Sequence, residues 1–112
     1  MEQILDIFKA LSDKNRLLVL KILQQGELCG CLLVAATALV QPQVSFHMKI
    51  LKKAGLVLTR RCGRWTYYRL NDTDMFMRFL LVAVLERIDR EEIAVAIKRL
   101  ESFRCSKNNP CG

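Results

Sequence analysis

Apolar residues recur along most of the chain at the three- and four-residue spacing of amphipathic helices. In the first half of the sequence this pattern predicts four helices, near residues 4–11, 14–25, 28–39 and 42–54. Ser12 or Asp13 can cap the second of these helices, and Gly26 can end it, because glycine tolerates a left-handed backbone. Pro42 suits the first turn of the fourth helix.

The pattern then changes to runs of branched and aromatic residues on either side of a glycine-bearing turn. Residues 56–61 and 65–70 therefore predict a β-hairpin with a basic tip. Asp72 or Thr73 can cap one long final helix, whose apolar stripe covers residues 76–100. Because the stripe is broader than the core of a small domain requires, we expect this helix and the first helix to form a homodimer interface. The alternative is a helix that packs only within its own chain.

These elements follow the order α-α-α-α-β-β-α in a chain whose 112 residues allow one domain. Two helices joined by a tight turn and followed at once by a basic hairpin form a winged helix-turn-helix. The predicted fold class is therefore mainly α with a small β-hairpin. We expect residues 1–104 to form one DNA-binding and dimerisation domain, and residues 105–112 to form a flexible tail that contains two cysteines.

The positive charge of the chain is concentrated in one internal segment. The net charge is +7 at pH 7, and residues 28–70 contain no Asp or Glu but seven basic residues: Lys49, Lys52, Lys53, Arg60, Arg61, Arg64 and Arg69. Outside this segment, acidic and basic residues balance. A neutral body with a basic middle favours a polyanionic partner such as double-stranded DNA, although a solvated basic face has the same composition.

The outward side chains of the fourth predicted helix and of the hairpin are the candidate contacts to DNA. Gln43, Ser45 and His47 lie on early turns that would enter the major groove, where they can reach base edges. The lysines of the helix and the arginines of the hairpin can bind phosphates. The full predicted set is Gln41, Gln43, Ser45, Phe46, His47, Lys49, Lys52, Arg60, Arg61, Arg64 and Tyr67.

Several functional classes are disfavoured by the sequence. The N-terminus lacks the basic start and cleavage site of a signal peptide, and the longest apolar run, residues 28–40, is too short to cross a bilayer. Five cysteines without an export signal indicate thiol chemistry or metal binding in a reducing compartment. We therefore expect a cytoplasmic protein with no membrane partner. We expect no enzymatic activity either, because spacing suggests neither a Cys–His dyad nor a phosphate-binding loop.

Cys29 and Cys31 place two thiols at the start of the third predicted helix. Helix N-terminal amides lower the pKa of a thiol, so this pair is expected to form thiolates more readily than a core cysteine. On a regular helix the two side chains would point roughly 200° apart, so one ion could join them only if that turn is distorted. Such a distortion would displace the recognition helix behind it. The alternative is a pair of inert core cysteines.

Four motifs carry a resemblance to a known family: residues 27–31 (Glu-Leu-Cys-Gly-Cys), 41–48, 54–57 and 63–70. Together they resemble the ArsR/SmtB family of metal-responsive repressors, and in particular its arsenic-sensing branch. The resemblance covers about residues 4–100. It implies a homodimer that represses metal-resistance genes on operator DNA and leaves the DNA when arsenite, or a thiophilic metal, binds.

The chain departs from the pattern of that branch at several positions. Val34 occupies the place of a third cysteine, Leu32 that of an acidic residue, and Val40 that of a serine that often caps the recognition helix. As(III) prefers three thiolates, so Cys105 or Cys111, from the same chain or its dimer mate, would complete the site. The expected ligands of As(III), with Sb(III), Cd(II) or Pb(II) as alternatives, are therefore Cys29, Cys31, Cys105 and Cys111.

Two other functions remain open at this point. One is a thiol redox switch in which Cys29 and Cys31, or the two cysteines of the tail, form disulfides. The other is a protein-interaction module that no longer binds DNA. The zinc-sensing branch of the family uses histidine and carboxylate ligands on its last helix, and His47 is the only histidine in this chain, so that site cannot be built.

Overall fold

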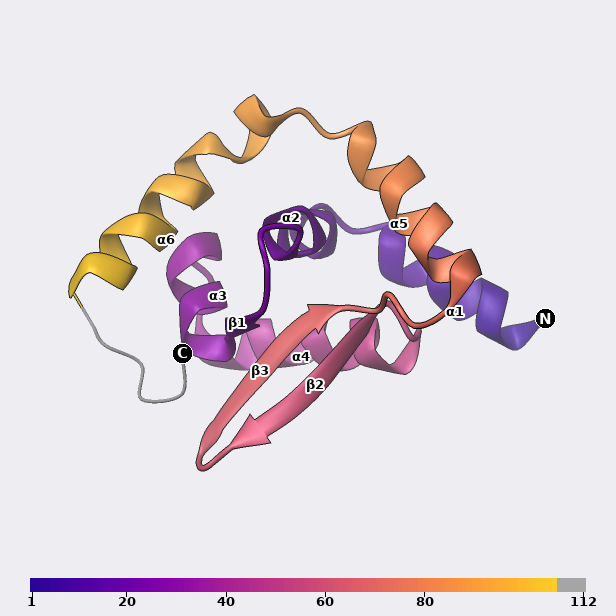
Figure 1. The fold of residues 1–112 in the computed structure, drawn as a ribbon, viewed down its shortest axis with the longest axis horizontal. Helices are drawn as coiled ribbons and strands as arrows, with labels where there is room; N and C mark the ends of the chain where they lie inside the picture. The colour runs from indigo at the N-terminus through magenta and orange to yellow at the C-terminus, as the bar shows by residue number, and fades with distance from the viewer. Residues whose placement is uncertain (107–112) are drawn as a thin grey trace.

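The computed structural model describes the backbone of residues 1–106 and the side chains of residues 1–103. This part of the chain is mainly helical and carries a small antiparallel sheet, so the predicted winged helix-turn-helix is confirmed. The elements, most of which are labelled in Figure 1, are α1 (Glu2–Leu11), α2 (Lys14–Leu23), β1 (Leu28–Cys29), α3 (Gly30–Thr37), α4 (Gln41–Lys53), β2 (Val57–Cys62), β3 (Trp65–Leu70), α5 (Met75–Glu86), the 3-10 helix η1 (Arg90–Ile93) and α6 (Ala94–Ser106).

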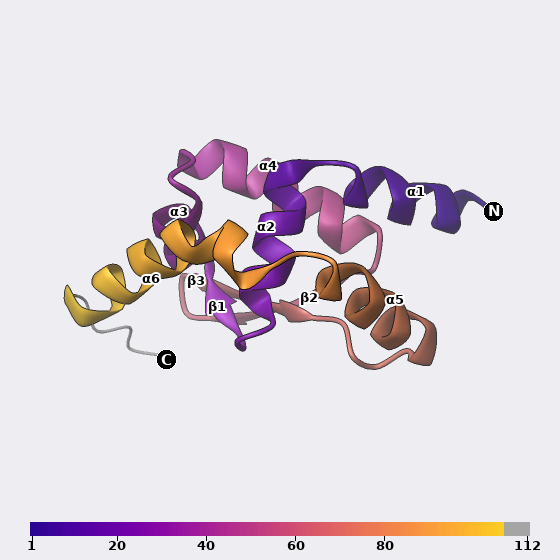
Figure 2. The ribbon, with the colours of Figure 1, turned by 90° about the horizontal axis from the view of Figure 1, so that it is seen from above.

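Helix α2 runs through the middle of the molecule, between α4 and the arc formed by α5 and α6 (Figures 1 and 2). Its start is fixed by Asp13, as the sequence predicted. The carboxylate accepts hydrogen bonds from the backbone N–H groups of Asn15 at 2.8 Å and Arg16 at 3.1 Å. Leu20 and Ile22 of this helix are fully buried. The central helix therefore provides a common core for the helix-turn-helix and for the C-terminal helices.

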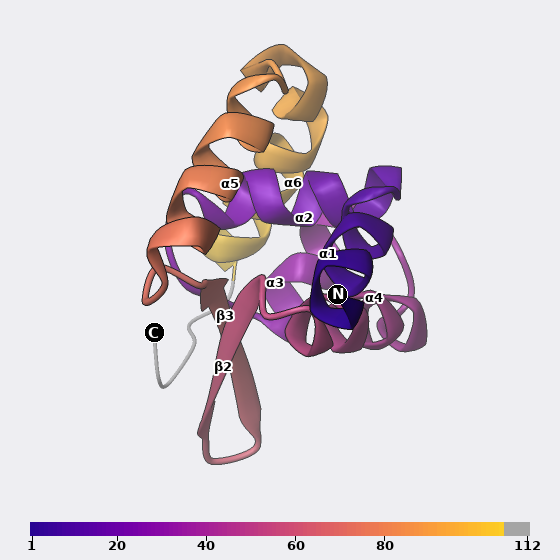
Figure 3. The same cartoon turned by 90° about the vertical axis from the view of Figure 1, so that its right-hand side faces the viewer.

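Strands β2 and β3 form the predicted hairpin. They are antiparallel and in register from the pair Val57–Leu70 to the pair Cys62–Trp65. Gly63, in the turn, has a φ of +61°, a conformation that glycine adopts without strain. The hairpin extends away from the helical body, in the position of a wing (Figure 3).

The sheet contains a third strand that the sequence pattern did not predict. Leu28 and Cys29 form β1, which pairs with β3 opposite Tyr68 and Tyr67 and gives the strand order β1-β3-β2. The predicted start of the third helix at Leu28 is therefore wrong, because α3 begins at Gly30. Two residues are too few to show a strand periodicity, and their extended conformation comes from the backbone edge that β3 offers for pairing.

Helices α3 and α4 form the helix-turn-helix. Ala38 has a left-handed φ of +60°, and its N–H donates to the carbonyl of Val34 at 3.0 Å, which ends α3. The fourth helix starts at Gln41 with Pro42 in its first turn, in agreement with the sequence.

Among the described residues no single helix has the length and apolar character needed to span a membrane. Helices α3 and α4 meet those criteria only as a pair, and this pair is bent by 112°.

The predicted single helix at the C-terminal end is divided into α5, η1 and α6, so the predicted element order is corrected both here and at β1. Asp74, rather than Asp72 or Thr73, caps α5. After α5 the backbone N–H of Asp89 donates to the carboxylate of Glu92 at 3.1 Å, which starts η1. Because of this break, α5 and α6 curve round α2, and α6 lies against α3 (Figure 1).

Candidate functional site

Helix α4 turns one face to the core and the other to the outside, as the sequence pattern predicted. Val44, Met48 and Leu51 are buried. Helix α4 and the hairpin lie on the side of the molecule opposite the α5–α6 arc (Figures 1 and 3), where one duplex can contact both. The predicted DNA contacts on this helix that are exposed are Gln41, Gln43, Ser45, Phe46, Lys49 and Lys52.

The first turn of α4 is ordered by side chains although Val40 offers no polar side-chain atom for a cap. The backbone N–H of Val40 donates to Oε1 of Gln43 at 3.1 Å, which forms one half of a capping box. Nε2 of Gln41 donates to Oγ of Ser45 at 3.2 Å. Three of the polar side chains predicted to contact DNA are therefore held in defined positions by the helix itself.

His47 is half-buried and contacts the corner where α1 joins α2. Its Nδ1 lies 3.1 Å from Nη1 of Arg16. A guanidinium group can only donate, so Nδ1 of His47 is the acceptor in this hydrogen bond. Nε of Arg16 also donates to the carbonyl of Ala10 at 2.8 Å. His47 therefore fixes α4 to the preceding helices, and its Nε2–H group is the part of the ring that can donate to DNA.

The same corner contains the carboxylate of Asp13, which lies 4.0 Å from Nη1 of Arg16. Partial burial acts to raise the pKa of Asp13, but the pKa is lowered overall because backbone N–H groups and the charge of Arg16 favour the carboxylate. At neutral pH an ionised cap and a charged arginine therefore hold the corner together beneath α4.

The wing presents fewer groups to DNA than the sequence predicted. Arg61 and Arg64, near its tip, are exposed. Arg60 instead forms a bidentate ion pair with Glu27, with Nη2 2.7 Å from Oε1 and Nε 3.0 Å from both carboxylate oxygens, and these hydrogen bonds raise the pKa of Arg60. The guanidinium lies 4.6 Å from the ring centre of Tyr67. Tyr67 is only 4% exposed, so its ring is part of the core and not of the predicted DNA surface.

Neither Cys29 nor Cys31 belongs to a disulfide, and the side chains of these two residues are hydrogen bonded to each other. Cys29 is fully buried at the end of β1 and has the extended conformation of a helix N-cap residue, with φ −80° and ψ 162°. Cys31 is half-buried in the first turn of α3. The expected separation of the two side chains does not arise, because Cys29 precedes the helix. The thiols converge without any unwinding of α3.

Burial, together with the hydrogen bond and the charge of Cys29, raises the pKa of Cys31 to about 11. The expected lowering of this pKa by the start of the helix is therefore wrong. Backbone hydrogen bonds at Leu32 and Cys31 do act to lower the pKa, but their effect is smaller than that of burial. At neutral pH Cys31 is a neutral thiol.

The structure leaves the remaining predicted ligands untested. Among the described residues, no group of three or more His, Cys, Asp or Glu side chains is placed to hold a metal ion. The backbone of Cys105 belongs to the last turn of α6, so this helix extends into the segment predicted as a tail. Cys111 lies outside the described residues. The described residues therefore bring together two cysteine side chains at this place, those of Cys29 and Cys31.

Exposed apolar side chains gather on α1 and α5, which lie at the same end of the molecule (Figures 1 and 2). An apolar surface of this kind marks an interaction site more often than a monomer surface. Its main members are Ile4, Leu5, Phe8, Met75, Phe76, Phe79 and Val82.

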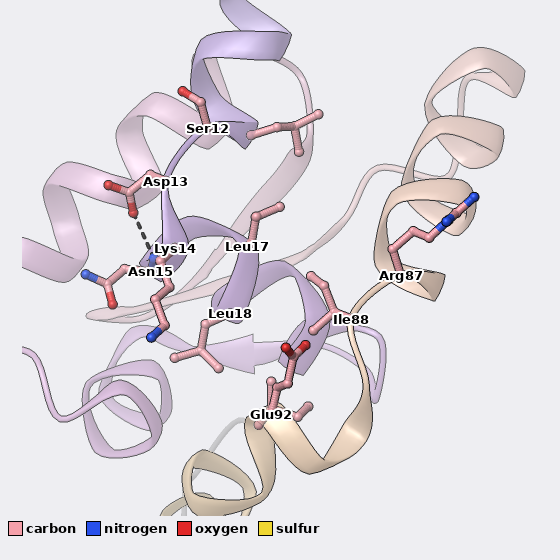
Figure 4. A pocket seen from close by; sticks show the side chains of 11 residues that line it. Ser12, Asp13, Lys14, Asn15, Leu17, Leu18, Arg87, Ile88 and Glu92 are labelled. Carbon is pink, nitrogen blue, oxygen red and sulfur yellow. Dashed lines mark hydrogen bonds between the residues drawn. The ribbon is translucent and has the colours of Figure 1, made fainter.

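A pocket of about 730 Å³ lies between the start of α2 and the turn that joins α5 to η1 (Figure 4). Leu17, Leu18 and Ile88 line it together with polar residues such as Lys14 and Glu92. Among the residues whose side chains the structure describes, no cysteine and no residue of α4 or the wing lines this pocket. It is therefore separate from both the thiol pair and the DNA-facing surface.

Comparison with known proteins agrees with the winged helix-turn-helix fold of this chain. Residues 13–59 match the family described as "Bacterial regulatory protein, arsR family". The chain is also 33% identical over 103 residues to the arsenical resistance operon repressor of Escherichia coli K12, a match that covers 91% of this chain and 88% of that protein. The chain belongs to the ArsR family. The predicted family resemblance is thus confirmed, and the protein is a transcriptional regulator rather than an enzyme.

Two further similarities support the assignment to the ArsR family. The arsenical resistance operon repressor of Staphylococcus xylosus is 37% identical over 99 residues, which cover 88% of this chain and 92% of that protein. A homodimeric winged helix-turn-helix DNA-binding domain from Mycobacterium bovis, described as a possible ArsR-family regulator, superimposes with a TM-score of 0.65 at 31% identity. That match covers 80% of this chain and 84% of the other.

Two residues of this ArsR-family chain have structural roles that sequence reasoning missed. Arg16 connects α4 to the α1–α2 corner, and Glu27 binds the wing. Nothing in the local pattern indicates Arg16. Glu27 does carry a signal, because it is the acidic residue immediately before the segment that contains only basic charges.

Alkylation of the native, metal-free protein tests the protonation of the thiol pair. Because only the thiolate reacts, and because the pKa of Cys31 is raised to about 11, the iodoacetamide rate at Cys31 should increase about tenfold per pH unit from pH 7 to 9.5. Mass spectrometry of the modified peptide measures this rate, with free cysteine as the control. A plateau at Cys31 below pH 9 would show that its pKa is not raised.

Proposed function

We propose that this ArsR-family protein represses an operator as a homodimer and leaves the DNA when arsenite binds Cys29 and Cys31. One observation carries the proposal: the converging thiols lie at the junction of β1 and α3. A single short segment therefore belongs both to the winged sheet and to the helix-turn-helix. A ligand that draws the two sulfur atoms together acts on both parts of the DNA-facing surface.

The proposed DNA contacts follow from exposure and charge. Helix α4 enters the major groove, where Gln41, Gln43, Ser45 and the Nε2–H group of His47 can reach base edges, and Phe46 can make apolar contacts. Phosphates are bound by the exposed cationic side chains Lys49, Lys52, Arg61 and Arg64. The affinity for the operator therefore depends steeply on salt, because each phosphate contact releases counterions.

The raised pKa of Cys31 favours arsenite over divalent metals as the inducer. Arsenite is present near neutral pH as As(OH)₃, and each As–S bond that forms replaces an As–O bond while the thiol proton leaves with the hydroxyl as water. The same balance holds for antimonite. Cd(II) and Pb(II) must instead displace thiol protons into solvent, which the raised pKa of Cys31 opposes.

The third thiolate of the proposed site comes from Cys105 or Cys111, of the same protomer or of its partner. The packing of α6 against α3 supports this, because the backbone of Cys105 belongs to α6. With this third sulfur atom, As(III) would have the pyramidal coordination by three thiolates that it prefers. Use of both C-terminal cysteines would give four thiolates, a set that suits Cd(II) or Pb(II).

The proposed dimer buries the apolar surface of α1 and α5 against its symmetry mate. Three observations support this assignment. The surface contains three exposed phenylalanines, Phe8, Phe76 and Phe79. It is at the end of the molecule away from the thiol pair (Figure 1). The solved domain from Mycobacterium bovis that resembles this chain is homodimeric.

Serine variants of the cysteine pair test the proposed inducer site. Arsenite should weaken operator binding by the wild type by about 5- to 150-fold, the usual range of allosteric coupling. Cys29→Ser and Cys31→Ser should bind the operator but lose this response, because each lacks one thiolate. Fluorescence anisotropy with labelled operator measures both properties.

The same titration distinguishes the alternatives. Cys105→Ser and Cys111→Ser identify the third ligand, since only the variant that lacks it should lose part of the thiolate-to-arsenic absorption. Normal release by both Cys29→Ser and Cys31→Ser would rule out the assigned thiols. Equal release of the wild type by peroxide in metal-free buffer would favour the redox switch.

Charge placed in the apolar surface tests the proposed dimer. Phe79→Glu should convert the protein to a monomer and weaken operator binding, because a carboxylate would be buried at the interface. Phe46→Glu is the matched control, since Phe46 is also exposed but lies on α4. Analytical ultracentrifugation measures the mass of each variant. A dimeric Phe79→Glu protein, or a monomeric Phe46→Glu protein, would contradict the assignment.

A further inference from the structure

An ion pair connects Glu27, which precedes the strand that contains Cys29, to the wing. Glu27 immediately precedes β1, and Arg60 lies in β2, on the far side of β3. Their three hydrogen bonds, of 2.7, 3.0 and 3.0 Å, make this a bidentate pair. The side chain of Glu27 is 26% exposed and that of Arg60 is 50% exposed. A pair of this geometry is more favourable than a typical surface salt bridge.

The register of the sheet explains how the two side chains meet. Cys29 lies opposite Tyr67, and Tyr67 lies opposite Arg60, so these three residues form one row across the three strands. Directly paired residues share a face of a sheet. The guanidinium of Arg60 crosses this face over the Tyr67 ring, 4.6 Å from its centre, and reaches the carboxylate of Glu27. The thiol of Cys29 and the wing are therefore connected through Tyr67, Arg60 and Glu27.

The wing residues proposed to bind phosphate follow Arg60 directly. Arg61 is the next residue of β2, and Arg64 is in the turn after it. A hairpin that projects from the body and is held at its base keeps these two side chains at a fixed distance from α4 (Figure 3). Two described acidic residues bind wing arginines, Glu27 to Arg60 and Asp72 to Arg69, and only Glu27 lies next to the strand that contains Cys29.

We infer that Glu27 and Arg60 are a positioning pair, which holds the wing in its DNA-binding position and is weakened when a ligand joins Cys29 to Cys31. This inference rests on the proposed function. Replacement of the hydrogen bond between the two thiols by two As–S bonds would shift the backbone at Cys29, and Glu27 is only two residues away along the chain. A hydrogen-bonded ion pair loses most of its strength when its atoms separate by a few tenths of a nanometre.

Thermodynamic linkage gives this arrangement a signature that does not require DNA. If ligand binding must weaken the pair, then a protein without the pair binds the ligand more tightly. Glu27→Gln and Arg60→Gln should each increase the arsenite affinity of the DNA-free protein by about two- to fivefold, the range of a surface ion pair. The double variant should show no larger gain than either single variant, because all three lack the same interaction.

Loss of the ion pair between Glu27 and Arg60 should also affect operator binding when no arsenite is present. Glu27→Gln should lower operator affinity by about two- to fivefold, because the wing is no longer held. Asp72→Asn is the matched control. It makes the same change in net charge and removes the other described ion pair of the wing, Arg69–Asp72 at 3.2 Å, which has no connection to the cysteines. Asp72→Asn should leave arsenite affinity unchanged.

The experiment is a titration of each full-length variant with arsenite, followed by thiolate-to-arsenic absorption and, separately, by anisotropy with operator DNA. Unchanged arsenite affinity in both Glu27→Gln and Arg60→Gln would overturn the positioning pair, as would a higher operator affinity in Glu27→Gln than in Asp72→Asn. In either case a wild type that still binds arsenite and releases operator keeps the proposed function. A wild type that binds no arsenite at its thiols would refute the proposed function itself.

Discussion

The backbone pairing of β1 with β3 is the interaction on which the rest of the site depends. It involves only Leu28 and Cys29, yet it sets the conformation of Cys29 and the residue at which α3 begins. An extended Cys29 faces Cys31, so two thiols converge at the entrance to the helix-turn-helix. The same pairing places Cys29 in one row with Tyr67 and Arg60 of the wing. The proposed sensor and the proposed DNA surface are therefore parts of one sheet-and-helix junction.

The proposed arsenite site and the proposed DNA surface meet at this junction but differ in charge. Cys31 is a neutral thiol at neutral pH, since burial and the neighbouring sulfur of Cys29 raise the pKa of Cys31 to about 11. The exposed face of α4 and the tip of the wing, by contrast, carry only positive charge. Glu27 lies between these two regions and neutralises Arg60. A neutral site suits a neutral metalloid hydroxide, while the cationic surface suits the phosphates of DNA.

Most elements of the fold could be predicted from the sequence because local signals specify them. The cap at Asp13, the proline at the start of α4 and the hairpin all have such signals. Strand β1 could not be predicted, because its conformation depends on an edge forty residues away along the chain. For the same reason the pattern could not show that Tyr67 is buried or that His47 is bound by Arg16. Long-range pairing, rather than periodicity, determines these features.

In the proposed mechanism, ligation of the cysteine pair acts on the wing through β1. Hydrogen exchange of the backbone amides, measured by mass spectrometry with and without arsenite, tests it most directly. We expect faster exchange in residues 57–70 when arsenite binds, because the pairing of β1 with β3 and the contact between Glu27 and Arg60 should both weaken. Unchanged exchange in these residues, together with altered exchange confined to α3 and α4, would contradict it.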